Sequence, residues 1–155
     1  MNESVGGSLL LNLVVVVIGT MIAIFTASFA YNKAYRAKSI IIDEIQNYIK
    51  TENKDLNNIE ELTANINEQL TNMGYRLTKK ECPTKENKQL INHDNSSYCI
   101  YEVAETDDIG NQNIYYEVQT YMYFDIPLVN FSIPVKGQTV SFRKNIVNVN
   151  MEGEL

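Results

Sequence analysis

Charged side chains are missing from one long stretch near the start of this chain. No Asp, Glu, Lys or Arg lies between Val5 and Asn32, and Leu9–Tyr31 is almost wholly apolar. A helix needs roughly 20 such residues to cross a bilayer. The stretch therefore predicts a transmembrane helix at residues 8–31, with most of the protein held as one globular part at a membrane surface.

Basic residues, histidine and catalytic motifs are also scarce. The 13 Lys and Arg residues are outnumbered by 19 Asp and Glu residues and form no basic stripe, so we expect no nucleic-acid partner. His93 is the only histidine, and no nucleophile motif such as G-x-S-x-G accompanies it. We therefore expect that the protein is not an enzyme and holds no cofactor, with His93 in a solvated loop.

Oxygen-bearing side chains gather in one short segment, at Asp107, Asp108, Asn111 and Asn113. Such side chains can bind Ca²⁺, but these lack the spacing and the closing Glu of an EF-hand. A plain turn is the favoured interpretation, and we expect no metal site.

Only two cysteines are present, Cys82 and Cys99, and their spacing fits no C-x-x-C metal or redox pattern. In an oxidising compartment they would form one disulfide, worth roughly 3 kcal/mol for a loop of this length. Both lie in or beside polar stretches typical of a surface. This favours the disulfide over two unpaired thiols in a cytosolic domain.

The apolar stretch lacks the marks of an ordinary secretory signal peptide. No Lys or Arg precedes it, it is too long, and no A-x-A site follows. Lys33, Arg36 and Lys38 follow it, and by the positive-inside rule they favour a cytoplasmic C-terminal part. The cysteine pair and the Tyr- and Asn-rich composition favour the outside, which is the orientation we predict.

The helical pattern continues beyond the membrane. Residues 32–50 contain no Pro or Gly, and their apolar positions recur at steps of three and four, as in an amphipathic helix. A polar loop at 51–57 precedes a second helix, with Asn58 as N-cap, Glu61 as its capping-box partner and Gly74 as C-terminal cap. Its predicted buried face is Ile59, Leu62, Ile66, Leu70 and Met73.

After Gly74 the hydrophobic period changes to two, which indicates strands. We predict strands at Tyr75–Thr78, Tyr98–Glu105, Ile114–Phe124 and Ser132–Arg143, with Ile146–Met151 as a last strand or a tail. The predicted connections are a long surface loop at Lys79–Ser97, a turn at Thr106–Asn113 and an apolar segment at Asp125–Phe131. The predicted fold class is α+β: a long N-terminal helix, a second short helix and an antiparallel sheet of about 3–5 strands, the head domain filling residues 51–155.

Two aromatic or apolar features leave alternatives open. Tyr115, Tyr116, Tyr121 and Tyr123 lie on both faces of one predicted strand, and one face normally covers the core. The remaining tyrosines are either exposed in a binding surface or packed in a core. The segment Asp125–Phe131 is apolar enough to touch a partner or the membrane, and burial over the end of the core is the alternative.

The apolar stretch begins Gly7-Ser8-Leu9-Leu10-Leu11-Asn12, after the short polar segment MNESVGG. A glycine before a small residue and a long apolar helix resembles the type IV pilin-like proteins, among them the TadE-like minor pilins of tight-adherence pili. The segments AYRAKSIIIDEIQNYI and YYEVQTYMYFDIPLVNFSIPVKGQT look like the small pilus-assembly proteins of this type from Gram-positive bacteria. The resemblance covers Gly6 to about Lys50 and, more weakly, the pattern of the whole chain.

The resemblance implies a processing step and an assembly step. A prepilin peptidase would remove residues 1–7 as a leader by cutting between Gly7 and Ser8. The helix would then pack with the helices of other pilin-like subunits. The chain departs from the family at two points: Asn12 stands where the family keeps a glutamate, and the leader has no basic residue.

The polar and small residues of the apolar stretch are the candidate helix-packing residues. Asn12 either pairs with a neighbour's amino terminus or backbone in a helix bundle, or lies at the edge of the bilayer. Gly19, Ala23 and Ala27 recur at steps of four, a spacing that permits close helix contact. An apolar helix containing several alanines also gives this spacing by chance.

Two functions fit these features. The favoured one is a minor pilin or pseudopilin, anchored in the cell membrane by a single span with its C-terminal domain extracytoplasmic, that acts in the assembly of a tight-adherence pilus. The alternative is a single-pass, membrane-tethered extracellular binding or sensor domain that uses the helix only as a tether.

Overall fold

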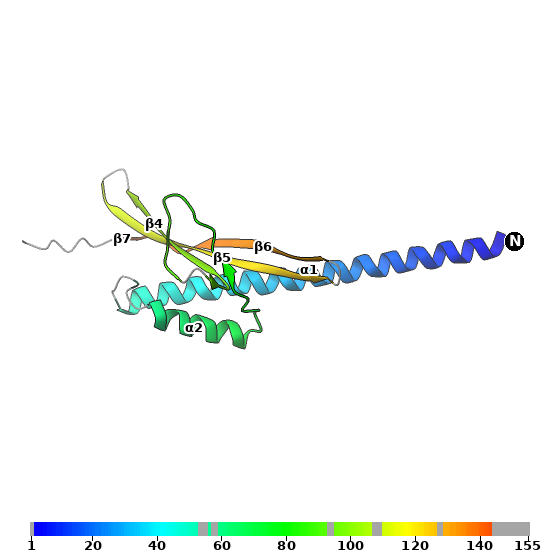
Figure 1. Cartoon of the computed structure of the whole chain (residues 1–155), viewed down its shortest axis with the longest axis horizontal. Helices are drawn as coiled ribbons and strands as arrows, with labels where there is room; N and C mark the ends of the chain where they lie inside the picture. The colour runs from blue at the N-terminus through cyan, green and yellow to red at the C-terminus, as the bar shows by residue number, and fades with distance from the viewer. Residues whose placement is uncertain are drawn as a thin grey trace, which may run out of the picture.

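The computed structural model describes residues 2–52, 56, 59–92, 95–106, 110–126 and 129–143. These residues form helices followed by strands, which confirms the predicted α+β class (Figure 1). The main sheet is antiparallel in the order β2-β4-β5-β6, with β7 paired to β5, and β1 pairs with β3 separately. The elements are α1 (Asn2–Glu52), α2 (Ile59–Asn72), β1 (Lys80–Glu81), β2 (Gln89–Leu90), β3 (Asn95–Ser96), β4 (Cys99–Thr106), β5 (Gln112–Ile126), β6 (Val129–Gln138) and β7 (Phe142–Arg143).

The first helix is unbroken and projects far beyond the head (Figure 1). The predicted continuation of the apolar stretch into an amphipathic helix is confirmed, because α1 is one helix from Asn2 to Glu52. No Pro interrupts this part of the sequence. At about 1.5 Å per residue the helix is roughly 75 Å long. Its second half buries a stripe under the sheet, formed by Ala34, Ala37, Ile41 and Ile45.

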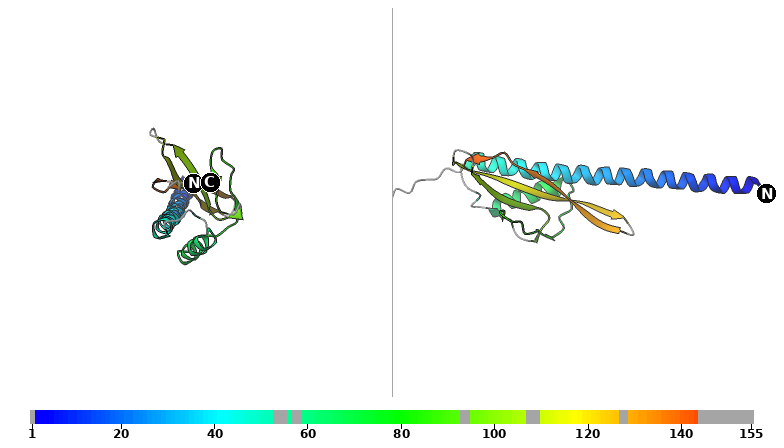
Figure 2. Two further views of the ribbon diagram at one scale, coloured as in Figure 1. Left: turned by 90° about the vertical axis from the view of Figure 1, so that its left-hand side faces the viewer. Right: turned by 90° about the horizontal axis from the view of Figure 1, so that it is seen from above.

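The second helix packs antiparallel to α1, on the same side of the sheet (Figure 2). Its predicted face is confirmed: Leu62, Ile66 and Leu70 are buried in the same core as Ile41 and Ile45. Gly74 ends it in the left-handed conformation, with a φ of 72°. The Tyr75 amide donates to the Leu70 carbonyl and the Gly74 amide to the Thr71 carbonyl, each at 2.9 Å, which is a Schellman motif.

The predicted strand at Tyr75–Thr78 is wrong, because this segment pairs with no strand. Tyr75 docks through its side chain instead. Its buried hydroxyl donates to the Tyr121 carbonyl and accepts from the Tyr121 amide, both at 2.9 Å. The last residue pair between β4 and β5 is Cys99 opposite Gln119. Beyond it, the Tyr75 hydroxyl takes the place of a β4 residue as hydrogen-bond partner for the backbone of Tyr121.

Two predicted connections contain strands. The loop Lys79–Ser97 includes β1, β2 and β3, which have two residues each and are too short to show a period. The apolar segment Asp125–Phe131 is wrong as a simple connection. In the structure β5 runs through Ile126, β6 begins at Val129, and Ile126 lies opposite Val129 in a hairpin.

The predicted turn before β5 is shorter than expected, because Thr106 ends β4 and Gln112 begins β5. Gly110 lies in this turn with a φ of 86°. Several predictions fall outside the described residues: Asn58 as N-cap, the placements of His93, Asp107 and Asp108, and the last strand or tail at Ile146–Met151.

Both faces of the sheet are covered. On the helix face, Tyr116, Val118 and Thr120 of β5 are buried against α1 and α2. On the other face, Cys99, Tyr101 and Tyr121 form a second buried cluster under the segment 80–92. The alternating tyrosines of β5 are thus largely packed in two cores, with Tyr115 and Tyr123 half-buried.

The Tyr75 hydroxyl gives the first prediction. We expect Tyr75→Phe to lower the free energy of unfolding by about 1–3 kcal/mol, because it strips two buried backbone groups of Tyr121 of their partner. The measurement is chemical unfolding of the full chain in detergent micelles. Tyr31→Phe, on the exposed part of α1, is the matched control and should leave stability unchanged. Equal stability of the two variants would contradict the prediction.

Candidate functional site on the exposed half of the first helix

The exposed half of α1 is the largest uncovered apolar surface of the described residues. None of its most apolar segment is buried within the protein, and the helix is long and apolar enough, by length and composition, to span a membrane. Large exposed apolar surfaces mark sites that contact proteins or membranes. The exposed side chains are Leu9, Leu10, Leu11, Leu13, Val14, Val15, Val16, Val17, Ile18, Met21, Ile22, Ile24, Phe25 and Phe29.

The hydroxyl groups of this surface are satisfied within the helix. Thr20 donates to the Val17 carbonyl at 2.8 Å, and Thr26 and Ser28 donate to carbonyls one turn earlier at 2.9 Å. In lipid each backbone and hydroxyl group must find such an internal partner. These residues therefore do not oppose burial in a bilayer or a helix bundle.

Asn12 differs from these hydroxyl residues. Its side chain is exposed, and among the described residues its amide group has no hydrogen-bond partner. A polar amide within an apolar span is costly unless another chain or the interface serves it. Gly7 and Ser8 also lie on this exposed surface, inside the continuous helix, and a Cβ on Gly7 would meet nothing within 4 Å outside its own stretch of helix.

The small residues divide into two groups. Gly19 and Ala23 are exposed, and a Cβ on Gly19 would meet nothing within 4 Å. Ala27 is half-buried, because Met122 and Phe124 of β5 pack beside it. The stripe continues through Ala30, Ala34 and Ala37 along the head-facing side of α1. The sequence predicts Ala34 and Ala37 on a core-facing stripe, but it gave no sign that Ala27 and Ala30 pack against the chain's own β5.

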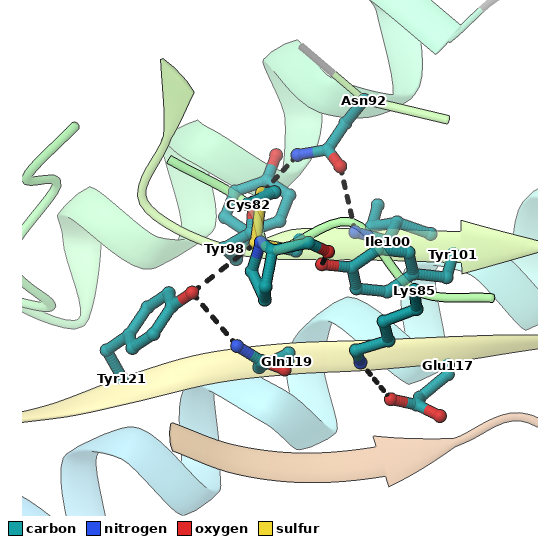
Figure 3. The surroundings of a disulfide bond; sticks show 11 residues. Cys82, Lys85, Asn92, Tyr98, Ile100, Tyr101, Glu117, Gln119 and Tyr121 are labelled. Atoms are coloured by element: carbon teal, nitrogen blue, oxygen red, sulfur yellow. Dashed lines mark hydrogen bonds and ion pairs between the residues drawn. A yellow bond between two sulfur atoms is a disulfide. The ribbon is translucent and has the colours of Figure 1, made fainter. Parts of the chain in front are cut away.

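The disulfide lies on the opposite face of the sheet (Figure 3). Cys82 and Cys99 are bonded, with their Cα atoms 5.7 Å apart, which confirms the predicted pair. Asn92 clasps the same strand by donating to the Tyr98 carbonyl at 2.7 Å and accepting from the Ile100 amide at 2.8 Å. The disulfide and the two hydrogen bonds of Asn92 together hold the segment 80–92 against β4.

Charged groups close the edge of this cluster (Figure 3). Lys85 lies 4.0 Å from the centre of the Tyr101 ring, and the Tyr101 hydroxyl donates to the Pro83 carbonyl at 2.7 Å. Lys85 and Lys88 both pair with Glu117. Burial would raise the pKa of Glu117, but the two lysines outweigh it and hold that pKa below its ordinary value.

The arrangement offers apolar and polar surfaces on which a partner or a membrane could bind. Across the described segments, no group of three His, Cys, Asp or Glu side chains is placed to hold a metal ion. Burial raises the pKa of Tyr101 to about 12, so its hydroxyl stays protonated as a structural donor. Comparison with protein-family models, with curated proteins and with solved structures returned no match for this chain.

The disulfide gives the second prediction. We expect the double variant Cys82→Ala, Cys99→Ala to lose about 3 kcal/mol in the free energy of unfolding, because the unfolded chain regains the freedom of the closed loop. A reductant should destabilise the natural chain by a similar amount and leave the variant unchanged. Chemical unfolding in micelles, with and without reductant, measures both. A natural chain that ignores the reductant would contradict the prediction.

Proposed function

We propose that the protein is a membrane-anchored minor pilin or pseudopilin that acts in the assembly of a tight-adherence, type IV-like pilus. In this proposal the exposed half of α1 first holds the head at the bilayer and then packs against the helices of other pilin-like subunits. The supporting observation is that none of the most apolar segment of this surface is buried, although the same helix continues into the buried stripe of the head.

The continuity of α1 favours assembly over simple tethering. A tether needs only an apolar span and a linker, whereas here the helix that would cross the membrane also forms the centre of the head core. The head and the span are therefore joined without a linker. A subunit of a helix-packed fibre needs this property, because the packing of the span then sets the position of the head.

The exposed polar and small residues support the same proposal. Gly19 and Ala23 leave room for a close helix neighbour. Asn12 lacks a partner among the described residues, and a neighbouring subunit would supply one. The resemblance of the segment from Gly7 to Asn12 to pilin-like proteins gives the proposal its specific form.

We place the head outside the cytoplasm. Lys33, Arg36 and Lys38 favour the reverse by the positive-inside rule. The bond between Cys82 and Cys99 favours an oxidising compartment, since disulfides are rare in the cytosol. We give the disulfide more weight because Cys99 is fully buried within a packed cluster.

The mature N-terminus tests the proposal. Co-expression of the full chain with a prepilin peptidase should yield a protein that begins at Ser8, as read by mass spectrometry of the purified membrane fraction. Gly7→Val should stay uncut, because the bulky side chain occupies the position before the cleaved bond. Gly6→Ala is the matched control and should be cut.

Two outcomes separate this proposal from its alternative. A product that begins at Ser8 supports the pilin-like function. An intact Met1 in the presence of an active peptidase, shown by cleavage of a known prepilin in the same cells, would contradict it. The protein would then be a membrane-tethered binding or sensor domain.

A further inference from the structure

The β5–β6 hairpin reaches along α1 into the uncharged stretch. Met122 and Phe124 of β5 are buried with Ala34, and Ala27 and Ala30 pack against the same cluster. Figure 1 and Figure 2 show this hairpin directed toward the N-terminal half of α1, and the view from above in Figure 2 shows the strands diverging from the helix toward their free end. The head thus contacts the span itself.

The level of the bilayer follows from the helix. A span that begins at Leu9 and needs roughly 20 residues ends near Phe29. Tyr31 and Tyr35 come next, with ring centres 6.1 Å apart. Lys33 lies between them in the sequence, and Arg36 follows Tyr35. Aromatic and basic residues are typical of the membrane–water interface. The interface therefore lies at about the level of residues 29–36.

The tip of the hairpin, defined here by the described strand ends at residues 124–126 and 129–131, lies at or below that level. Phe124 belongs to the cluster against which Ala27 and Ala30 pack. From there β5 continues for two more residues, pairing Asp125 with Asn130 and Ile126 with Val129. Two strand residues extend about 6–7 Å. If α1 spans the bilayer as far as Phe29, the tip lies at the depth of the lipid and must contact it.

The tip has the chemistry of an interfacial element. Phe124 and Phe131 stack with their ring centres 4.5 Å apart. Phe131 is 45% exposed and Ile133 is 43% exposed, although both lie on the helix-facing side of the hairpin.

Basic side chains lie at the same level of α1, near the end of α2. Lys33 and Arg36 line a cavity of about 390 Å³ together with Phe29, Asn32 and Met73. Lys33 also donates to the Gly74 carbonyl at 3.4 Å. The positive charges of Lys33 and Arg36 complement the phosphate groups of lipids. The end of α2, which lies beside them, therefore faces the membrane–water interface as the hairpin does.

We propose that the tip of the β5–β6 hairpin docks into the headgroup region of the bilayer that α1 spans, with Phe131 as its main apolar contact. The proposal rests on the anchoring part of the proposed function and is independent of processing and pilus assembly. Docking would hold the head against the bilayer in one orientation before any helix partner binds.

The chain contains no tryptophan, so a single introduced tryptophan is the only source of tryptophan fluorescence. The full chain is reconstituted in phosphatidylcholine vesicles whose acyl chains are brominated near the headgroup, and flotation with the vesicles is measured first. We expect Phe131→Trp to lose about half of its emission relative to unbrominated vesicles, since its ring would lie among the lipids. Ile133→Trp should lose less, because it lies two residues further from the tip.

Val140→Trp is the matched control, because Val140 is 55% exposed at the distant end of the head and should show no quenching. A chain that floats, with Phe131→Trp quenched no more than Val140→Trp, would overturn the docking and leave the anchoring intact. A chain that does not float would overturn both. A third outcome would also overturn lipid docking: the emission of Phe131→Trp is not quenched by bromine, but it shifts to shorter wavelength as the protein-to-lipid ratio rises. A second copy of the chain would then cover the tip.

Discussion

The close contact between α1 and β5 organises the rest of the head. Ala34 and Ala37 are fully buried where the strand crosses the helix, and the Thr120 hydroxyl donates to the Ala34 carbonyl at 3.1 Å. Only small side chains permit a strand to approach a helix backbone this closely. Gly137 on β6 also lies close to α1, because a Cβ there would lie 2.6 Å from Cδ of the Lys38 side chain and 3.0 Å from Cδ1 of Ile42.

Other features follow from this contact. With α1 fixed under β5, the stripe of Ile41 and Ile45 meets the buried face of α2, and the opposite face of the sheet requires a cover of its own. The segment 80–92 supplies that cover, held by the bond between Cys82 and Cys99 and by the side chain of Asn92. The contact also joins the head to the span, because the helix that supports β5 is the helix whose other half is exposed and apolar.

Features with a long regular period could be predicted from the sequence. The steps of three and four in α1 and α2 and the alternation in β4 and β5 each reflect one face packed on the core. The Gly74 cap was also predictable, since a left-handed residue after an apolar face favours glycine. The cysteine pair was found from composition and compartment alone.

Features that depend on distant contacts could not be predicted. Tyr75 lies in an apolar alternation that resembles a strand, but its hydroxyl serves Tyr121, 46 residues away. The two-residue strands show no period, and the apolar tip of the hairpin resembles a connection because Pro127 interrupts it. The small residues of α1 suggest contact with other helices, and only the fold shows that Ala27 packs against the chain's own hairpin.

The apolar half of α1 and the head form one rigid unit, because α1 runs unbroken through both. The most direct measurement is the distance distribution between two spin labels in the full chain reconstituted in lipid nanodiscs. Cysteines replace Ile18 in the span and Val140 in the head, both exposed, while the native cysteines are bonded to each other. We predict a single narrow distribution, because α1 continues unbroken from the span into the head core. A broad distribution, as a flexible tether would give, would contradict the account.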